Sequence, residues 1–519
     1  MAEIAGDARL AVCDLGSNSF RLVVFEAHGA SPETLGGWWR RIDEIYEPVR
    51  VGAGMDASGA LGEAGMTRAI AAAELFAHFT GAVGLARQEV DAVATSAIRD
   101  ATNSELFLDR ARTASGLPIR VLSREQEARY GYLAAVNSSN LGDGAVLDLG
   151  GGSMQLVEVR GRRAQTLDSW RLGAVRMTER FLPGSEPPGR KALARLREHV
   201  AAALERAGWL EGAGRLVGIG GAVRNLAAAT QHALGLPSFG VQGFLVEREA
   251  LDELVERLAS MSAGERGTLP GIKPARGDII LAGAVVVQAV LERTAARGIE
   301  AIEAGLREGV FFERLLADRP EPLFDDVRRA SVMNLAARYD GRPAHTRHVA
   351  KLALGLFDEL ASAGLHGGDP AERELLWASA MLHDIGVAID YDDHHKHSRY
   401  LVLNAGLPGF DPRDAALIGQ VVRYHRNRKG LPQPGPFGPL LRNGDAAVLD
   451  RCAVLLRLAE DLERSRDQIV RRAHAHPGGD GGAVRLELVA DVDAPVARWA
   501  AARERELFAR AFGRDLVVV

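Results

Sequence analysis

The sequence predicts two α/β parts, an all-α part and a small α/β appendage at the C-terminal end. Three observations predict this fold class. The first 320 residues alternate short β-rich runs with longer helical patterns. After about residue 322 the patterns are helical in succession. A hairpin motif also occurs twice in the α/β part, at residue 14 and again 134 residues later at residue 148, which indicates an internal repeat.

Short apolar runs predict the strands of the α/β part, and longer periodic stretches predict its helices. The strands are expected at 10–14, 20–25, 90–94, 119–122, 145–148, 154–159 and 215–218. The helices are expected at 65–79, 105–115, 124–135, 190–208, 223–234 and 247–263. The apolar stretch 279–291 is shorter than the ~20 residues of a membrane span, so it predicts a buried helix.

The second half of the chain changes character from mixed to helical. Helices are expected at 325–338, 344–360, 372–384, 397–404, 413–425 and 445–466. A break at 476–482 precedes a strand at 484–489, a helix at 494–512 and a strand at 516–519. The predicted domains are therefore 1–128, 129–318, 319–475 and 476–519.

The composition is that of a globular protein and excludes several classes. With 519 residues, 25% charged and a net charge of −5, the chain is not basic enough for a general nucleic-acid or anionic-membrane binder. Its two cysteines offer no disulfide framework. The first residues show no basic and apolar leader, so a cytoplasmic location is expected.

The repeated hairpin has the residue types of a phosphate-binding turn. Residues 14–23 align without gaps on residues 148–157, with six of ten positions identical. Small residues let backbone N–H groups converge on phosphate oxygens, and serine hydroxyls add donors. The predicted phosphate-binding residues of the two turns are Gly16, Ser17, Asn18 and Ser19, and Gly150, Gly151, Gly152 and Ser153. Asp14 and Asp148, at the strand ends, can hold a divalent cation. The alternative is a pair of hairpins with ordinary glycine turns.

This pattern resembles the paired phosphate loops of the actin, sugar-kinase and chaperone-ATPase fold. The chain is similar, over residues 8 to about 466, to the exopolyphosphatase / guanosine pentaphosphate phosphohydrolase family. The motifs that carry the resemblance lie at 11–22, 94–103, 123–129, 147–153, 218–224, 305–309, 383–386, 394–398 and 407–410. The resemblance implies two actin-like (ribonuclease H-like) domains, an HD-type helical domain, Mg²⁺ or Mn²⁺ as cofactor, and a homodimer.

The resemblance also implies roles for particular residues. Glu127 would be the general base that activates water, and Arg99 would bind phosphate through its guanidinium fork. Arg224, Arg21 and Arg307 are expected as weaker candidates for phosphate contacts.

One position departs from the family pattern, in which the second loop usually runs Gly-Gly-Gly-Ser-Thr-Glu. Here Gln155 stands at the position of the glutamate. Gln155 keeps an oxygen for the metal site with Asp14 and Asp148 but loses the charge, so Gln155→Glu is expected to alter the magnesium dependence.

Histidines are concentrated in the helical part, where eight of the 14 fall within residues 345–425. His345, His383, Asp384 and Asp461 match the pattern of HD metal phosphohydrolases, which predicts a second divalent metal. The histidines that could extend this set toward a further metal are His394, His395, His397 and His425. The alternative is a helical domain without metal. The basic run 423–429 is a candidate track for a polyanion or a solvated helix end.

The predicted function is removal of the terminal phosphate from inorganic polyphosphate, with Mg²⁺ and Glu127 as base. The first alternative is hydrolysis of guanosine pentaphosphate to the tetraphosphate in the same cleft. The second is a polyphosphate or alarmone sensor with weak hydrolysis, which the neutral Gln155 favours. An actin-fold kinase is a third, against which the motif around Glu127 argues. No nucleic-acid or membrane partner is expected.

Overall fold

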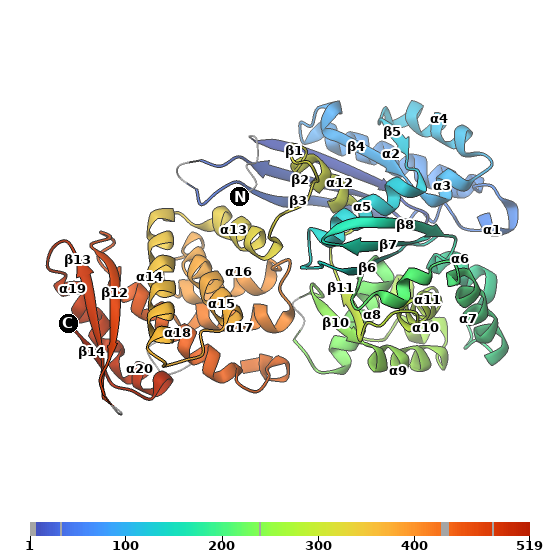
Figure 1. Cartoon of the computed structure of the whole chain (residues 1–519). Helices are drawn as coiled ribbons and strands as arrows, with labels where there is room; N and C mark the ends of the chain where they lie inside the picture. Colours follow the sequence, from blue (N-terminus) through green and yellow to red (C-terminus); the bar gives the residue numbers. More distant parts are fainter. Residues whose placement is uncertain (1–6, 32–33, 238–239, 427–434, 480–481) are drawn as a thin grey trace. The chain divides into compact units, whose positions relative to one another are not determined.

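The computed structural model describes residues 7–519 apart from 32–33, 238–239, 427–434 and 480–481. Its chain divides into two compact units (Figure 1). The first, the α/β unit, contains the residues up to His28 and Trp39–Val327. The second, the C-terminal unit, contains Arg328–Val519 together with the short segment Gly29–Trp38.

The α/β unit begins with a five-stranded sheet in the order β3-β2-β1-β4-β5. Its strands are β1 (Ala8–Leu15), β2 (Phe20–His28), β3 (Trp38–Glu47), β4 (Val90–Ala94) and β5 (Ile119–Val121). β1 pairs with β2 in antiparallel fashion and with β4 in parallel. Every residue of β4 is buried, as expected for a strand covered on both faces.

A second sheet repeats this plan with one added strand, in the order β10-β11-β9-β6-β7-β8. Its strands are β6 (Gly144–Leu149), β7 (Met154–Arg160), β8 (Arg163–Trp170), β9 (Leu216–Ile219), β10 (Phe244–Glu247) and β11 (Gly298–Ala301). The hairpin register is the same in both sheets, because Asp14 lies opposite Arg21 and Asp148 lies opposite Gln155. The predicted internal repeat is therefore confirmed, and each sheet is consistent with an actin-like domain.

Twelve α-helices are described in the α/β unit up to residue 315. They are α1 (Met55–Ser58), α2 (Glu63–Ala82), α3 (Ser96–Asp100), α4 (Ser104–Ser115), α5 (Arg124–Val136), α6 (Ala174–Phe181), α7 (Arg190–Leu204), α8 (Gly221–Ala233), α9 (Arg248–Ala259), α10 (Ala263–Arg266), α11 (Ile280–Glu292) and α12 (Leu306–Leu315). The apolar stretch 279–291 forms α11, whose residues are nearly all buried, as predicted. No helix in the described part of the chain is long and apolar enough to cross a membrane.

Two helices are exchanged between the halves of the α/β unit. α5 follows the first sheet in sequence but packs against β6, β7, β8 and β9 of the second (Figure 1). α12 follows the second sheet but packs on β1 and β2, where Phe311 stacks on Phe25 with ring centroids 4.4 Å apart. α5 and α12 also pack on each other. The border predicted at 128/129 falls inside α5.

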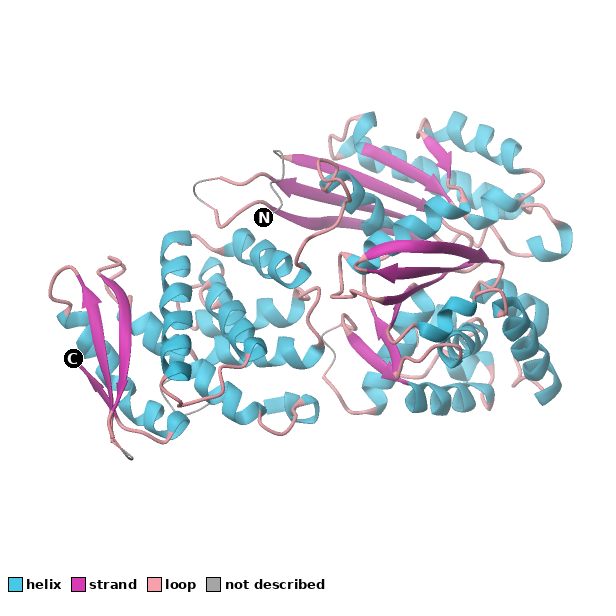
Figure 2. Cartoon of the chain, in the orientation of Figure 1, coloured by secondary structure: helices cyan, strands magenta, loops and turns pink. Residues whose placement is uncertain are grey.

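The C-terminal unit combines helices with a three-stranded sheet (Figure 2). Its helices are α13 (Val327–Tyr339), α14 (Pro343–Ser362), α15 (Pro370–Leu382), α16 (His394–Asn404), α17 (Pro412–Tyr424), α18 (Asp445–Leu462), α19 (Pro495–Ala501) and α20 (Arg505–Phe512). Its strands β12 (Val470–Pro477), β13 (Val484–Ala490) and β14 (Leu516–Val518) pack into the same hydrophobic core as the helices. The C-terminal α/β appendage therefore shares a core with the helical part.

The structure contains five strands that the sequence analysis missed, namely β3, β8, β10, β11 and β12. β3 and β8 are edge strands. β3 carries many charged and exposed residues, and β8 is mostly polar and only partly buried, so both lack the apolar runs used to find strands. The helix expected at 494–512 is instead two short helices, α19 and α20.

Candidate active site

A cavity of 150 Å³ lies where the turns of the two repeated hairpins meet in the α/β unit. The sequence-predicted residues that line it are Asp14, Gly16, Ser17, Asn18, Ser19, Glu127, Asp148, Gly150, Gly151, Ser153, Gln155 and Arg224. Arg21 and Arg307, the other weaker candidates, line it as well. The structure therefore brings together residues from both repeats around one space, as the paired-turn prediction requires.

The two turns approach each other so closely that Gly152 has no room for a side chain. A Cβ at Gly152 would lie 2.7 Å from Oγ of Ser96 and 2.9 Å from Oγ of Ser17. These two hydroxyls lie 3.1 Å apart and are hydrogen-bonded. Gly152 thus lets the second turn rest against the first.

Flanking segments fix the direction of the peptide groups in both turns. The carbonyl oxygens of Ser17 and Asn18 accept hydrogen bonds from the N–H groups of Gly52 and Arg50. Those of Gly150 and Gly151 accept from the N–H groups of Ala174 and Val175. In a trans peptide the next N–H points opposite to the C=O. The N–H groups of the next residues, 18, 19, 151 and 152, therefore point away from these flanking segments. They can donate hydrogen bonds to an anion.

Glu127 stands in the first turn of α5, which begins with a capping box between Ser123 and Gln126. Glu127 is 6% exposed, and its carboxylate is held at both oxygens. Arg99 Nη1 lies 2.7 Å from Oε2, and the Ser153 hydroxyl donates to Oε1 at 3.1 Å. Burial raises the pKa of the Glu127 carboxyl above its ordinary value, although the charge of Arg99 opposes this shift. A buried, oriented carboxylate with a raised pKa is suited to accept a proton.

Gln155 determines which way Ser153 directs its proton. Nε2 of Gln155 donates to Ser153 Oγ at 2.9 Å and approaches Ser169 Oγ at 3.4 Å. Because Ser153 Oγ accepts from the amide, its own hydroxyl hydrogen is available for Glu127. The amide of Gln155 thus supports the hydrogen bond that orients Glu127.

Three carboxyl groups face the same cavity, and burial raises the pKa of each. The pKa of Asp148 rises to about 7, first through burial and then through the charges of Glu127 and Asp14. Burial raises the pKa of Asp14 too, although Arg307, 3.6 Å away at Nη1, opposes the shift. Crowded carboxylates with raised pKa values are the environment that a hard cation stabilises.

Four arginines line the same cavity, of which sequence reasoning missed Arg276. Burial and the charges of Arg307 and Arg21 lower the pKa of Arg224 to about 10. The guanidinium of Arg276 lies over Gly221, where a Cβ would clash with it. Nothing in the local sequence marks Arg276, because its position depends on the distant turn at 220–221. Crowded guanidinium groups favour a ligand with several negative charges.

Arg99 lines a neighbouring cavity of 670 Å³ in the same unit. This second cavity, the arginine-lined cavity, shares Ser153 with the site and contains six arginines but only two carboxylates. The arginines are Arg99, Arg124, Arg171, Arg176, Arg180 and Arg206. Nε and Nη2 of Arg99 are buried and have no hydrogen-bond partner among the described residues. Arg99 therefore contacts Glu127 through Nη1 and also lines the arginine-lined cavity next to the site.

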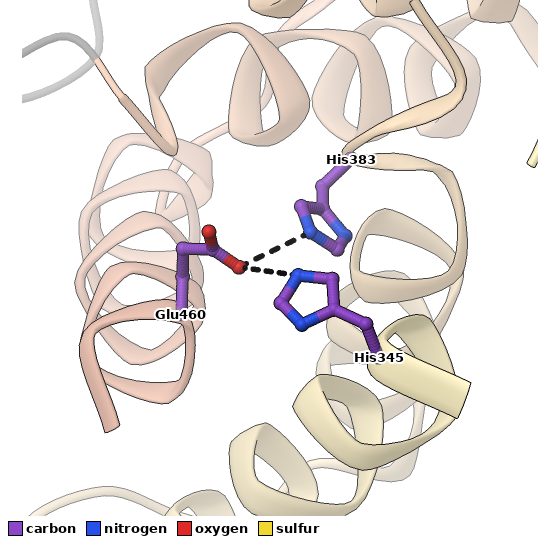
Figure 3. Close-up of side chains that lie close together, drawn as sticks. All are labelled: His345, His383 and Glu460. Carbon is purple, nitrogen blue, oxygen red and sulfur yellow. Dashed lines mark ion pairs between the residues drawn. The ribbon is translucent and has the colours of Figure 1, made fainter. Parts of the chain in front are cut away.

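The predicted metal residues of the C-terminal unit are partly brought together. His345 and His383 lie with Glu460 in one group (Figure 3), and Asp384 lies with His394 and His425 in another. Asp461 is in neither group, and its neighbour Glu460, which sequence reasoning missed, takes the expected place. A helix presents adjacent residues about 100° apart, so only one of the two can face the histidines. Residues 427–429 of the basic run lie outside the described residues.

Two sequence patterns of one protein family match this chain. The pattern of the Ppx/GppA phosphatase family matches residues 36–318, and that of Ppx/GppA phosphatase domain III matches residues 327–497. Together the two matches extend over both units.

Two relatives match most of this chain and most of their own length. Proteins named guanosine-5'-triphosphate,3'-diphosphate pyrophosphatase from Vibrio vulnificus and Vibrio parahaemolyticus are each 28% identical to this chain, over 90% of it and 89% of their own length.

Solved structures resemble about three fifths of this chain. The Aquifex aeolicus member of the Ppx/GppA protein family is 27% identical, covers 61% of this chain and all of its own, and has a TM-score of 0.52. An exopolyphosphatase from Cytophaga hutchinsonii, 20% identical, covers 61% of this chain and all of its own with a TM-score of 0.54, and shows the fold alone.

Proposed function

Since the chain belongs to the Ppx/GppA phosphatase family, and is thus a hydrolase of phosphoanhydride bonds, we propose that it removes the terminal 5'-phosphate of guanosine pentaphosphate. The observation that carries the proposal is the convergence of two phosphate-type turns, a buried base and four arginines on one cavity. The shared name of the two Vibrio relatives, which match both units, supports this substrate over the polyphosphate that the sequence analysis put first.

The turns and the arginines bind the phosphate chain. N–H groups of the two turns, with the hydroxyls of Ser17 and Ser19, take the terminal phosphate, and the cavity arginines offset the charge of the phosphates behind it. Bound in this way, the terminal phosphorus lies beside Glu127.

Glu127 activates the attacking water. Its carboxylate accepts a proton from the water as the water oxygen forms a bond to the terminal phosphorus. The bond from that phosphorus to the bridging oxygen breaks, and inorganic phosphate and the shortened chain leave. Arg99 and Ser153 hold the carboxylate in place during proton transfer.

Asp14 and Asp148 fit a magnesium ion, because they are partly buried carboxylates whose pKa values are raised, and a bound cation would lower those pKa values again. Gln155 can contribute only Oε1, since Nε2 is committed to the serine hydroxyls. When bound there, Mg²⁺ would neutralise charge on the phosphate oxygens.

Inorganic polyphosphate is the second candidate substrate. The arginine-lined cavity supports it, because a long polyanion needs a basic surface beyond the cleft itself. A nucleotide with a short phosphate chain does not need a basic surface beyond the cleft.

The test is phosphate release by the full chain from guanosine pentaphosphate and from long-chain polyphosphate, compared as kcat/KM. Glu127→Gln is expected to lose about 10²–10⁴-fold in kcat on either substrate, the usual contribution of a general base. Glu125→Gln is the matched control, since Glu125 is exposed in the same turn of α5. Equal rates for wild type and Glu127→Gln would contradict the proposal. Tight binding without phosphate release would instead favour the sensor.

A further inference from the structure

The arginine-lined cavity begins at the two residues that hold Glu127. Ser153, whose hydroxyl donates to Oε1 of Glu127, lines both this cavity and the 150 Å³ cavity of the active site. Arg99, whose Nη1 lies 2.7 Å from Oε2 of Glu127, lines the arginine-lined cavity. The two cavities are therefore neighbours, and the residues that orient the base form part of the boundary between them.

The arginine-lined cavity has an excess of positive charge. Its two carboxylates, Asp100 and Glu205, stand against six arginines. Asp100 lies 3.2 Å from Nε of Arg171 and 3.6 Å from Nη2 of Arg124. Asp100 also lies 3.6 Å from Nε of Arg99. One carboxylate does not neutralise three guanidinium groups, so the cavity favours a small anion that carries more than one negative charge.

The six arginines differ in exposure, and the difference indicates where the cavity leads. Arg99 and Arg176 are only partly exposed, and both contact the site. Nε of Arg176 donates to the carbonyl oxygen of Gly152 in the second turn at 3.1 Å. The fully exposed arginines are Arg124, Arg171, Arg180 and Arg206. The cavity therefore extends from the phosphate-type turn to solvent.

One edge of the Arg99 guanidinium has no acceptor in the protein. Nη1 donates to Glu127 and to the carbonyl oxygen of Leu122. Nε and Nη2 are buried and have no hydrogen-bond partner among the described residues. Nε and Nη2 form the edge of arginine that binds two phosphate oxygens side by side. A phosphate beside Arg99 would satisfy both donors.

The chemistry proposed for the site produces such an anion next to Arg99. In an in-line displacement the attacking water and the leaving oxygen lie on opposite sides of the phosphorus. Glu127 marks the side of the water, and the shortened chain marks the opposite side. The shortened chain therefore lies between the new orthophosphate and the route by which the substrate entered.

We infer that the arginine-lined cavity binds the orthophosphate product, which leaves through this cavity before the shortened chain leaves the cleft. The inference rests on the proposed function, because it takes Glu127 as the base. Orthophosphate passes Ser153, reaches the open edge of Arg99 and continues to the exposed arginines. Glu127 has accepted a proton by then, so its charge no longer attracts Arg99, and Arg99 is available to the phosphate.

The first test is the pattern of product inhibition. Formation of guanosine tetraphosphate from guanosine pentaphosphate by the full chain is followed by chromatography, with orthophosphate added at constant ionic strength. A product that leaves first is a noncompetitive inhibitor against the substrate, and a product that leaves last is a competitive one. Noncompetitive inhibition by orthophosphate and competitive inhibition by the tetraphosphate are expected. Competitive inhibition by orthophosphate would overturn the inference.

The double variant Arg180→Gln/Arg206→Gln tests the cavity itself. Both side chains are exposed and line the arginine-lined cavity, and neither lines the active-site cavity, so KM for the pentaphosphate is expected to stay the same. The inhibition constant of orthophosphate is expected to rise about three- to tenfold, since exposed charge contacts are individually weak. Arg197→Gln is the matched control, because Arg197 is exposed on α7 and does not line this cavity. An equal inhibition constant in the double variant and the control would contradict the assignment.

Equilibrium dialysis with radiolabelled orthophosphate separates this inference from the proposed function, because it requires no turnover. The wild type, saturated with guanosine tetraphosphate, is expected to bind orthophosphate, and the double variant to bind it about three- to tenfold more weakly. Absent binding by the wild type, or equal binding by both proteins, would overturn the inference even if the pentaphosphate is hydrolysed. Binding that depends on the two arginines, without hydrolysis of the pentaphosphate, would support the phosphate site and contradict the proposed substrate.

The remaining outcome concerns long-chain polyphosphate. A raised KM for polyphosphate in the double variant, with unchanged binding of orthophosphate, would assign the cavity to the substrate chain and overturn its role for the product. Circular dichroism checks the fold of each variant, and the inhibition pattern and dialysis of the wild type test the inference even if the double variant fails to fold.

Discussion

The carboxylate of Glu127 is held by one residue from each repeat of the α/β unit. Arg99 comes from the first repeat and Ser153 from the turn of the second. The base is therefore oriented only while the two halves are in contact. Arg99 also affects the proton affinity of the base, because its charge lowers the pKa that burial raises.

Arg99→Met is expected to move the acidic limb of the pH–rate profile to higher pH. The base must be ionised to act, so the rate rises with pH through the pKa of Glu127. Loss of the Arg99 charge raises this pKa further. Arg124→Met is the control, since Arg124 lines the arginine-lined cavity beside Arg99 and forms an ion pair with Asp100. An unchanged or lowered limb in kcat/KM would contradict this role for Arg99.

Gln155→Glu is expected to weaken orientation of the base and to change the magnesium titration. A carboxylate at position 155 cannot donate to Ser153, so the serine hydroxyl turns toward it and away from Glu127. The new charge also joins Asp14 and Asp148, which favours cation binding. The half-saturating magnesium concentration should therefore fall several-fold, with a lower kcat at saturation. An identical titration curve would refute this account of Gln155.

The residues of the site that sequence predicted are those in continuous motifs. The two turns and Glu127 are local patterns, so their convergence on one cavity followed from the repeat. Arg276 and Glu460 escaped prediction because they face their partners only through contacts between distant segments. For Glu460 the adjacent Asp461 also fitted the expected pattern, and only the rotation of α18 distinguishes the two.

At the scale of elements, the α5–α12 contact joins the halves of the α/β unit. Gly309 of α12 lies against the backbone of Tyr130 in α5, where a Cβ would overlap the carbonyl oxygen. Gly309→Ala is thus expected to lower the free energy of unfolding by about 1–3 kcal/mol, as overpacking does. Gly81→Ala in α2 is the control, because nothing lies within 4 Å of its added methyl group. Chemical denaturation measures both, and equal stability of Gly309→Ala and wild type would be evidence against a tight contact.

Sequence patterns predicted the buried elements better than the edges of the sheets. β1, β4 and α11 are mostly apolar and mostly buried and were found, since burial favours apolar runs. β3 has a largely exposed and charged sequence, and its pairing is decided by the neighbouring hairpin strand. β3 is a strand because it pairs with a neighbouring strand of the sheet, and the residues of β3 alone do not reveal this pairing.

At the scale of the whole molecule, the two units carry separate chemistry. The α/β unit has small-residue turns, carboxylates and arginines, which suit phosphate and a hard cation. The C-terminal unit has imidazoles and carboxylates, which suit transition metals. The concentration of histidines in the C-terminal unit, which is visible in the sequence, reflects this difference between the two units.

The exchange of α5 and α12 has a consequence for synthesis on the ribosome. Phe25 is covered by Phe311, which lies 286 residues later in the chain. At a synthesis rate of ~5–20 residues per second, the apolar face of β1 and β2 stays uncovered for roughly 15–60 s before α12 is made. Chains stalled before α12 emerges are therefore expected to be cleaved near Phe25 by added protease, and chains stalled after it emerges to be protected there. The N-terminal half of the α/β unit is thus the first part to be made and one of the last to be finished.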